Sequence, residues 1–295
     1  MTTAKGASEW GIVLNFLLFV AKLVAGLISN SIALLSDAFH SLSDVLASVG
    51  IFFAVKIAGK PADRTHPFGH HRAEPLAAFV VAVLTALLGF EILITAIKHI
   101  ITPVETNIGI LAFSVLLGTM LVKTLMYYYF RRTGKRYDSP ALAATGIDAR
   151  NDISVSFIAL VGVIGSYLGF PLIENLVAII IAGVLFYVAY DLGRSNANYL
   201  LGGAPDKHLQ DAVVRRALQT RGVEGVKAVR AHYIGNYVNL EIVILVRERM
   251  SVKRSHAIGV QVRESIQGLR GIERVFVHTD PLESTRLDRR TILKH

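Results

Sequence analysis

The sequence predicts an α-helical membrane protein with six transmembrane helices and a cytoplasmic α+β ferredoxin-like domain towards its C-terminus. Three observations lead to this fold class. The 295 residues are 53% hydrophobic and only 18% charged, which is typical of a membrane protein with a polar remainder. The long apolar runs all lie before about residue 200, and charge becomes dense after it. The connections between the apolar runs alternate in charge.

Six apolar segments are long enough to cross a bilayer, which requires about 20 residues of helix. They lie at 11–30, 33–57, 74–100, 108–130, 141–167 and 173–193. The connections after the second and fourth segments are basic, whereas those after the first, third and fifth contain no Lys or Arg. By the positive-inside rule, both termini are cytoplasmic. We expect a multi-pass protein of the plasma (inner) membrane, in contact with lipids.

The charged residues carry further information. We interpret the formal charge of +9 as charge on cytoplasmic loops, not as a nucleic-acid interface. Cysteine is absent, which excludes disulfides and thiolate metal sites. The chain therefore lacks the thiolate ligands that soft ions such as Cu(I) prefer. Lys22 and Lys123 fall inside apolar segments, and we expect their long side chains to reach the membrane interface.

A small soluble domain follows the apolar segments. Residues 206–221 read as a helix, two strands follow in GVKAVRAHYIG and YVNLEIVILV, a second helix opens on a Ser N-cap, and IERVFVHTD reads as a third strand. The order αββαβ is that of a ferredoxin-like layer of helices on a sheet. We expect a transmembrane domain over 1–203, a regulatory or dimerising domain over 204–283 and a disordered tail over 284–295.

Titratable side chains recur within two of the apolar segments. His40 and Asp44 lie one helical turn apart on one face of the second segment, and Asp37 lies a further turn away. The fifth segment repeats the spacing with Asp148 and Asp152. A lone membrane carboxylate can be a structural hydrogen-bond partner, but each charge costs about 2.5 to 3.5 kcal/mol at bilayer depth. Two such pairs therefore favour a shared site in which one imidazole and three carboxylates surround a divalent ion.

Four stretches together carry a family resemblance. SDAFHSLSDVLAS, PADRTHPFGHHRAEPLAA, DARNDIS and GGAPD resemble the cation diffusion facilitator family of divalent-metal transporters, in an order that covers nearly the whole chain. The resemblance implies a homodimer that exports Zn²⁺ or a related ion from the cytosol in exchange for protons. It also implies a transport site made of His40, Asp44, Asp148 and Asp152.

The ligand types leave the transported ion open. Asp148 stands where zinc exporters of the family often have His, and the ARND run resembles manganese-exporting members. Three oxygen ligands and one nitrogen suit Zn²⁺, Mn²⁺, Fe²⁺ or Co²⁺. We favour zinc, with manganese and iron as the next alternatives.

Proton exchange follows from the chemistry of the ligands. Carboxylates and imidazole bind metal only when deprotonated, so that loading the ion expels protons and reprotonation expels the ion. A site that opens alternately to each side is then a metal/proton exchanger. Asp37, a turn nearer the extracellular end, either relays protons at the exit or is solvated at the helix mouth.

The resemblance implies two further groups of metal ligands. In the loop, Asp63, His66 and His70 match a second, interfacial metal site of some family members, although a solvated turn is the alternative. In the soluble domain, positions that bind regulatory zinc in relatives are matched by His256, His278 and Asp280, with His232 and Glu241 as additions. Glu241 replaces a His that relatives often have, and exposed polar residues without metal are the alternative there.

Two other classes of function compete with transport. A membrane-embedded metallohydrolase would use the same four ligands to activate water, but the sequence contains no HExxH, no GxSxG and no separate general base beside the cluster. A metal-sensing scaffold that never transports is the second alternative. We expect a transporter and no enzymatic activity.

Overall fold

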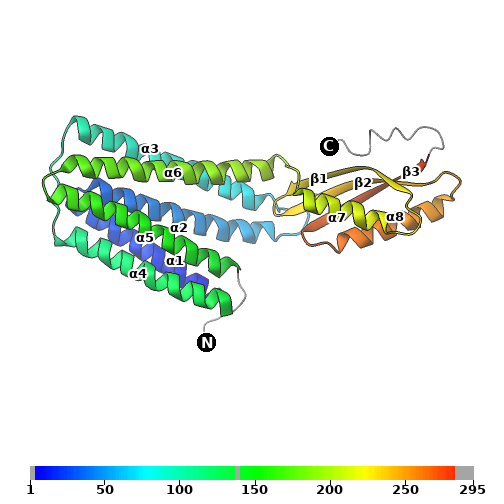
Figure 1. Ribbon diagram of the computed structural model, residues 1–295, viewed down its shortest axis with the longest axis horizontal. Coiled ribbons are helices and arrows are strands. Elements are labelled where there is room, and N and C mark those ends of the chain that lie inside the picture. Colours follow the sequence, from blue (N-terminus) through cyan, green and yellow to red (C-terminus); the bar gives the residue numbers. More distant parts are fainter. Residues whose placement is uncertain (1–3, 137–139, 283–295) are drawn as a thin grey trace. The chain divides into compact units, whose positions relative to one another are not determined.

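The computed structural model describes residues 4–136 and 140–282 (Figure 1). The predicted tail, 284–295, lies outside the described residues. The chain forms two compact units. The first runs to Phe53 and resumes from Ala77 to Arg194, and the second joins Ala54–Leu76 to the chain from Ser195 onward.

All six predicted apolar segments are helices. They are α1 (Ala4–Ser29), α2 (Ile32–Ala58), α3 (Ala73–Ile101), α4 (Ile110–Arg136), α5 (Pro140–Tyr167) and α6 (Pro171–Leu200). Among the described residues, five helices are long and apolar enough to cross a membrane. The exception is α5, which carries Asp148, Arg150 and Asp152 within five positions. The predicted fold class is confirmed, and the protein is a multi-pass integral membrane protein.

Small side chains bring the helices close together. The main core of the helical unit draws on α1, α2, α4, α5 and α6, with Ala25, Ala33, Leu116, Ala159 and Ile181 among its buried members. A Cβ placed on Gly162 of α5 would lie 3.0 Å from the Cβ of Ala33 and 3.1 Å from that of Val177. This close approach fixes α5 against α2 and α6.

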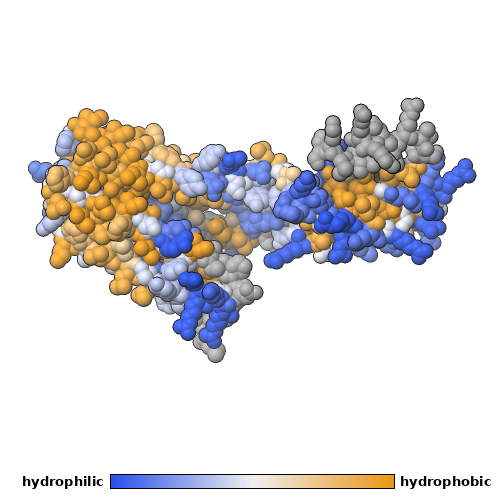
Figure 2. Space-filling view, in the orientation of Figure 1, coloured by the Kyte–Doolittle hydropathy of each residue, from blue (hydrophilic) through white to orange (hydrophobic). Residues whose placement is uncertain are grey.

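The outside of the helical unit is apolar. Figure 2 shows hydrophobic side chains over much of its visible surface. Large apolar residues such as Phe52, Leu87 and Leu121 are each more than half exposed. Such a surface suits a hydrocarbon environment, where the backbone groups are satisfied within helices.

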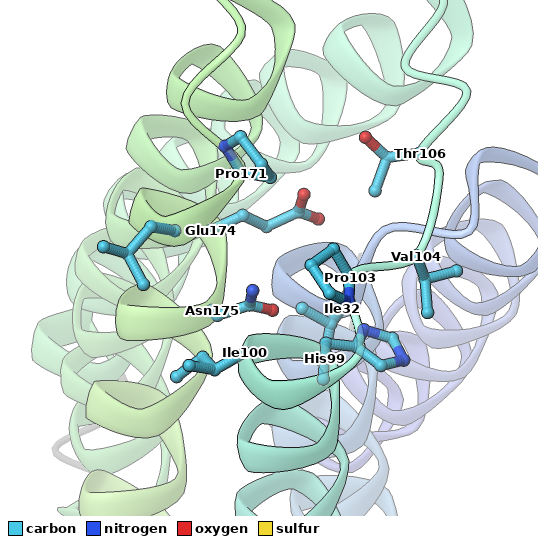
Figure 3. A pocket seen from close by; sticks show the side chains of 10 residues that line it. Ile32, His99, Ile100, Pro103, Val104, Thr106, Pro171, Glu174 and Asn175 are labelled. Atoms are coloured by element: carbon cyan, nitrogen blue, oxygen red, sulfur yellow. The ribbon is translucent and has the colours of Figure 1, made fainter.

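A buried carboxylate completes the start of α2. The hydroxyl of Ser31 accepts from the backbone N–H of Leu34 at 3.3 Å and donates to Glu174 of α6. The same Glu174 oxygen accepts from the N–H of Ala33 at 3.4 Å. Glu174 also lines a cavity of about 120 Å³ between the ends of α2, α3 and α6, which includes His99 (Figure 3). The Glu174 carboxylate lies at the N-terminus of α2, where backbone N–H donors and the helix dipole stabilise a carboxylate.

The C-terminal elements form the predicted αββαβ order. They are α7 (Lys207–Leu218), β1 (Gly225–Ile234), β2 (Tyr237–Arg247), α8 (Val252–Gln267) and β3 (Ile272–Leu282). The sheet order is β1-β2-β3, with β1 antiparallel and β3 parallel to β2. One core of buried apolar residues joins both helices to the sheet, and Val213, Ile242 and Val262 are completely buried in it.

The loop between α2 and α3 packs with this sheet in the second unit. The His71 ring lies 4.7 Å from that of Tyr237 on β2, measured between centroids. The guanidinium of Arg274 on β3 lies 5.5 Å from the centroid of the Phe68 ring. The loop is therefore part of the unit that contains the C-terminal sheet.

Candidate metal centre

Three of the four predicted transport ligands lie together. His40 and Asp44 of α2 and Asp152 of α5 each offer one ligand atom, and these atoms lie within 4.8 Å of one another. His40 Nε2 is 3.5 Å from Asp152 Oδ1. His40 and Asp152 are buried and Asp44 is half-buried. The spacing suits a divalent ion held by one nitrogen and carboxylate oxygens.

Two atoms of this group lack ordinary partners. His40 Nδ1 and one carboxylate oxygen of Asp44 are buried, and neither has a hydrogen-bond partner within the described part of the chain. An unsatisfied buried polar atom is costly. A metal ion bound among these side chains would satisfy the Asp44 oxygen that the protein itself leaves unpaired.

Asp148 lies outside this group of three. It is one turn before Asp152 on α5, and its side chain is exposed. Four residues along a helix correspond to about 6 Å. The two carboxylates of α5 therefore occupy successive turns of the helix, and within the described residues it is Asp152 that groups with His40 and Asp44.

Lys123 does not reach the interface as predicted. It is 1% exposed, and its Nζ donates to Asp152 Oδ2 and, at 2.8 Å, to Asn15 Oδ1 of α1. Lys123 stands in the middle of α4, thirteen residues or about 20 Å from either end. In the segment predicted at 108–130, Lys123 is only seven residues from the end, so its central position became visible only with the longer helix of the structure.

Lys22 is also buried, and the expectation that it snorkels was wrong as well. Its Nζ lies 2.8 Å from Asp37 Oδ2, and both side chains are completely buried. Lys22 also donates to the hydroxyls of Ser41 and Ser156, and Ser156 donates to Asp37. An opposite charge inside the bundle offsets the burial of each group. Asp37 is therefore held in an ion pair and does not lie at a solvated helix mouth.

All three predicted loop ligands come together. Ligand atoms of Asp63, His66 and His70 lie within 4.8 Å of one another, with Asp63 and His66 exposed and His70 less so. His70 Nε2 is 3.4 Å from Asp63 Oδ2. The hydroxyl of Thr65 and the backbone N–H of His66 both donate to Asp63. These hydrogen bonds lower the pKa of Asp63 to about 2, which keeps its carboxylate charged at neutral pH.

The C-terminal candidates do not form such a group within one chain. Among the described residues, no set of three metal-ligating side chains within 4.8 Å includes a member of this domain. His278 Nε2 lies 2.8 Å from Asp280 Oδ1. The neighbouring Lys227, which donates to Asp280 at 2.6 Å, lowers the pKa of that carboxyl.

The other three candidates of this domain lie elsewhere on its surface. His256 lines a shallow hollow between α8 and β3 together with Arg263 and Phe276. His232 and Glu241 are exposed on β1 and β2, where His232 pairs with Asn239 and Glu241 with Arg230. His232 and Glu241 are therefore diagonal neighbours, which lie about 7 to 8 Å apart in an antiparallel pair of strands.

Comparison with known proteins gives two family models. The cation efflux transmembrane domain matches residues 10–201, and the cytoplasmic domain of cation efflux proteins matches residues 205–282. A solved nickel form of a MamM C-terminal domain variant is 29% identical, and the similarity covers 26% of this chain and all of that one with a TM-score of 0.26.

Two relatives are similar over almost their full length. The uncharacterized transporter MJ0449 of Methanocaldococcus jannaschii is 35% identical over 91% of this chain and 95% of its own. The manganese efflux system protein MneP of Bacillus subtilis is 27% identical over 92% of this chain and 93% of its own. Together with the family models and the polar group between α2 and α5, these similarities show that the chain belongs to the cation diffusion facilitator family, whose members are transporters that export divalent metal ions.

Proposed function

We propose that this protein exports a divalent first-row metal ion, with Mn²⁺ as its main cargo, in exchange for protons. The observation that supports the proposal is the group formed by His40, Asp44 and Asp152, whose ligand atoms lie within 4.8 Å of one another between α2 and α5. Asp148, one turn before Asp152 on α5, is the proposed fourth ligand, which the ion contacts as it enters or leaves the group of three.

The donor set and the relatives both favour manganese. Carboxylate oxygen ligands suit harder ions such as Mn²⁺, while a single imidazole also accepts Fe²⁺, Co²⁺ and Zn²⁺. The relatives MneP and MneS of Bacillus subtilis are named as manganese efflux proteins. Zinc, which the sequence alone favoured, is the alternative cargo, and iron and cobalt follow.

Proton exchange follows from competition for the same atoms. A proton and a metal ion cannot occupy the same lone pair of an imidazole or a carboxylate, so metal binding releases protons. If the group opens alternately to the two sides of the membrane, a proton gradient drives metal in the opposite direction. Asp37 remains a proposed proton relay, because it lies one helical turn from His40 on α2.

Flux in liposomes tests the proposal. The full chain is reconstituted with a metal-sensitive dye inside, and Mn²⁺ entry is followed with and without an imposed pH gradient. We expect gradient-dependent entry that Asp44→Asn reduces to the rate of protein-free liposomes. Asp211→Asn, which makes the same change at an exposed position of α7, should transport normally.

Competition identifies the cargo and the class of function. Zn²⁺, Fe²⁺ and Co²⁺ are added in turn as competitors, and the ion that inhibits Mn²⁺ entry at the lowest concentration is the preferred one. Metal binding without flux would instead support the sensing scaffold. Flux that Asp44→Asn leaves unchanged would contradict the proposed site.

We also propose a homodimer with cytoplasmic termini, in which residues 1–203 transport and residues 204–283 regulate. The C-terminal candidates would bind metal only in combination with a second copy of the chain; they are His232, Glu241, His256, His278 and Asp280. The loop group, Asp63, His66 and His70, would couple or deliver metal.

Single-cysteine variants give an unambiguous labelling test of orientation, because the chain has no cysteine of its own. Light scattering of the detergent-solubilised protein gives the oligomeric state.

A further inference from the structure

Lys123 contacts a proposed cargo ligand directly. Its ammonium group donates to Asp152 Oδ2, while His40 Nε2 lies 3.5 Å from the other oxygen, Asp152 Oδ1. We propose that Lys123 is a tethered counter-cation that competes with the cargo ion for Asp152 and withdraws towards Asn15 when the ion binds. The inference rests on the proposed transport role of this group and adds a residue that sets its affinity.

The competition follows from charge. A divalent ion bound to Asp152 would share that carboxylate with an ammonium group that is 1% exposed. The ion and the ammonium group are both positive, and like charges that contact the same carboxylate repel strongly when solvent is excluded. The ion and the ammonium group therefore cannot both hold Asp152 at full strength, and each weakens the binding of the other.

Asn15 provides the alternative acceptor. Its Oδ1 lies 2.8 Å from Lys123 Nζ and belongs to α1, whereas Asp152 belongs to α5. An amide oxygen is neutral, so the ammonium group can keep a hydrogen bond there while the carboxylate binds metal. Without that acceptor, the withdrawn ammonium would be buried with no partner, which is costly.

The second buried lysine shows that burial alone does not give this role. Lys22 pairs with Asp37, which is not in the three-ligand group, and its other bonds go to hydroxyls. Among the described residues, Lys22 and Lys123 are the buried lysines, and of these Lys123 contacts a member of the group. Lys22 therefore stabilises the bundle, whereas Lys123 competes with the cargo.

This competition would assist release. A site made only of carboxylates and imidazole holds a divalent ion tightly and frees it slowly. The return of the Lys123 ammonium to Asp152 offers the carboxylate a replacement charge at the moment the ion leaves. Removing the ammonium should therefore tighten binding and slow turnover, so that both KM and the maximal rate fall.

Calorimetry on the full chain in detergent tests the inference. Mn²⁺ is titrated into protein that carries Asp63→Ala and His70→Ala, so that heat from the loop group is removed. In this background we expect Lys123→Gln to lower the Kd for Mn²⁺ by about tenfold, which corresponds to about 1.4 kcal/mol. Lys253→Gln, which removes the same charge at an exposed position of α8, should leave the Kd unchanged.

A second variant predicts the opposite change. Asn15→Leu removes the neutral acceptor and confines the ammonium group to Asp152, so the Kd should rise by about tenfold. A merely structural role for Lys123 would give either no change in affinity or weaker binding in both variants. If Lys123→Gln does not fold, Lys123→Met, which also removes the ammonium group, replaces it with the same expected fall in the Kd.

The outcomes separate this inference from the proposed function. If the parent protein binds and transports no Mn²⁺, the proposed function fails. If the parent binds and transports Mn²⁺ but Lys123→Gln binds it equally or more weakly, only the role of Lys123 is overturned. An unchanged Kd in Asn15→Leu would also overturn it.

Discussion

Charged residues inside the helical unit pair across helices. Lys22 pairs with Asp37, and Lys123 pairs with Asp152; each of the four side chains is less than a tenth exposed. A buried charge is costly alone and acceptable only with a close, hydrogen-bonded partner. The two pairs therefore hold α1 against α2 and α4 against α5, and they limit which substitutions the bundle tolerates.

The first pair gives a prediction about stability. Lys22→Met leaves Asp37 buried without its counter-charge, so the free energy of unfolding should fall by about 3 to 5 kcal/mol. In Lys22→Met/Asp37→Leu both charges are gone. The loss of unfolding free energy in this double variant should be smaller, by at least about 1 kcal/mol, than the summed losses of Lys22→Met and Asp37→Leu. Denaturant unfolding in detergent measures all four proteins. Additive effects would show that the two residues do not interact.

The loop carboxylate gives a prediction about pH. Hydrogen bonds from Thr65 and His66 lower the pKa of Asp63 to about 2, below the ordinary value of about 3.9. A depressed folded pKa means that these bonds stabilise the turn above about pH 3.9 and that this contribution is lost as the pH falls towards 2. Thr65→Val keeps the shape and removes the hydroxyl donor, so the pKa of Asp63 should rise towards its ordinary value. The ¹³C shift of the Asp63 carboxyl measures it, and a pKa that stays near 2 would contradict the assignment.

The lysines show where residue-level prediction from sequence failed. Helical periodicity predicted that His40 shares a face with Asp44 and that Asp148 shares one with Asp152, because i and i+4 residues lie on one face of a helix. The partners of Lys22 and Lys123 lie on other helices, and the distances between helices are set by packing, which periodicity does not contain. For Asp148, the same periodicity predicted the shared face, but the level at which α5 meets α2 decides which carboxylate lies beside His40.

At the scale of elements, α5 depends on a close approach to its neighbours. A Cβ on Gly162 would lie 3.0 Å from the Cβ of Ala33 on α2 and 3.1 Å from Val177 on α6. The α2–α5 contact carries the proposed ligands, so the spacing between these helices controls the geometry of the site.

Gly162→Val should therefore separate α5 from α2. We expect the free energy of unfolding to fall by about 1 to 3 kcal/mol from overpacking and Mn²⁺ flux to fall with it. Gly118→Val on α4 is the matched control, because a Cβ there meets nothing within 4 Å. Equal losses in the two variants would show that the helix propensity of glycine, and not the α2–α5 contact, is responsible.

The extent of each element was largely predictable from the sequence. The third segment, predicted at 74–100, forms α3 over Ala73–Ile101, because an apolar run of that length is long enough to span a membrane as a helix. In contrast, α4 and α6 run six and seven residues past the ends predicted for them, at 130 and 193. The helix predicted over 206–221 ends earlier, at Leu218. Gly222 adopts a φ of +100°, a conformation suited to glycine, and the chain turns towards β1 there.

At the scale of the whole molecule, the loop between α2 and α3 belongs to the same compact unit as the C-terminal sheet. Gly235, in the turn between β1 and β2, has a φ of +62°, and a Cβ there would lie 2.1 Å from the carbonyl oxygen of His71. The next residue, Asn236, donates to Glu74. The hairpin therefore supports the backbone beside the proposed loop ligand His70.

Gly235→Ala should displace that backbone. The added methyl group cannot coexist with the His71 carbonyl, so His71 moves away and shifts its neighbour His70 relative to Asp63. We expect the Kd of the loop group for Mn²⁺ or Zn²⁺ to rise by about tenfold, measured by calorimetry in an Asp44→Asn background that removes the transmembrane contribution. Gly271→Ala is the control, because Gly271 also has a positive φ, +89°, but a Cβ there meets nothing within 4 Å. Backbone strain is thus common to both variants, and only the contact with the loop differs. Equal affinities in the two variants would show that the hairpin does not position the loop ligands.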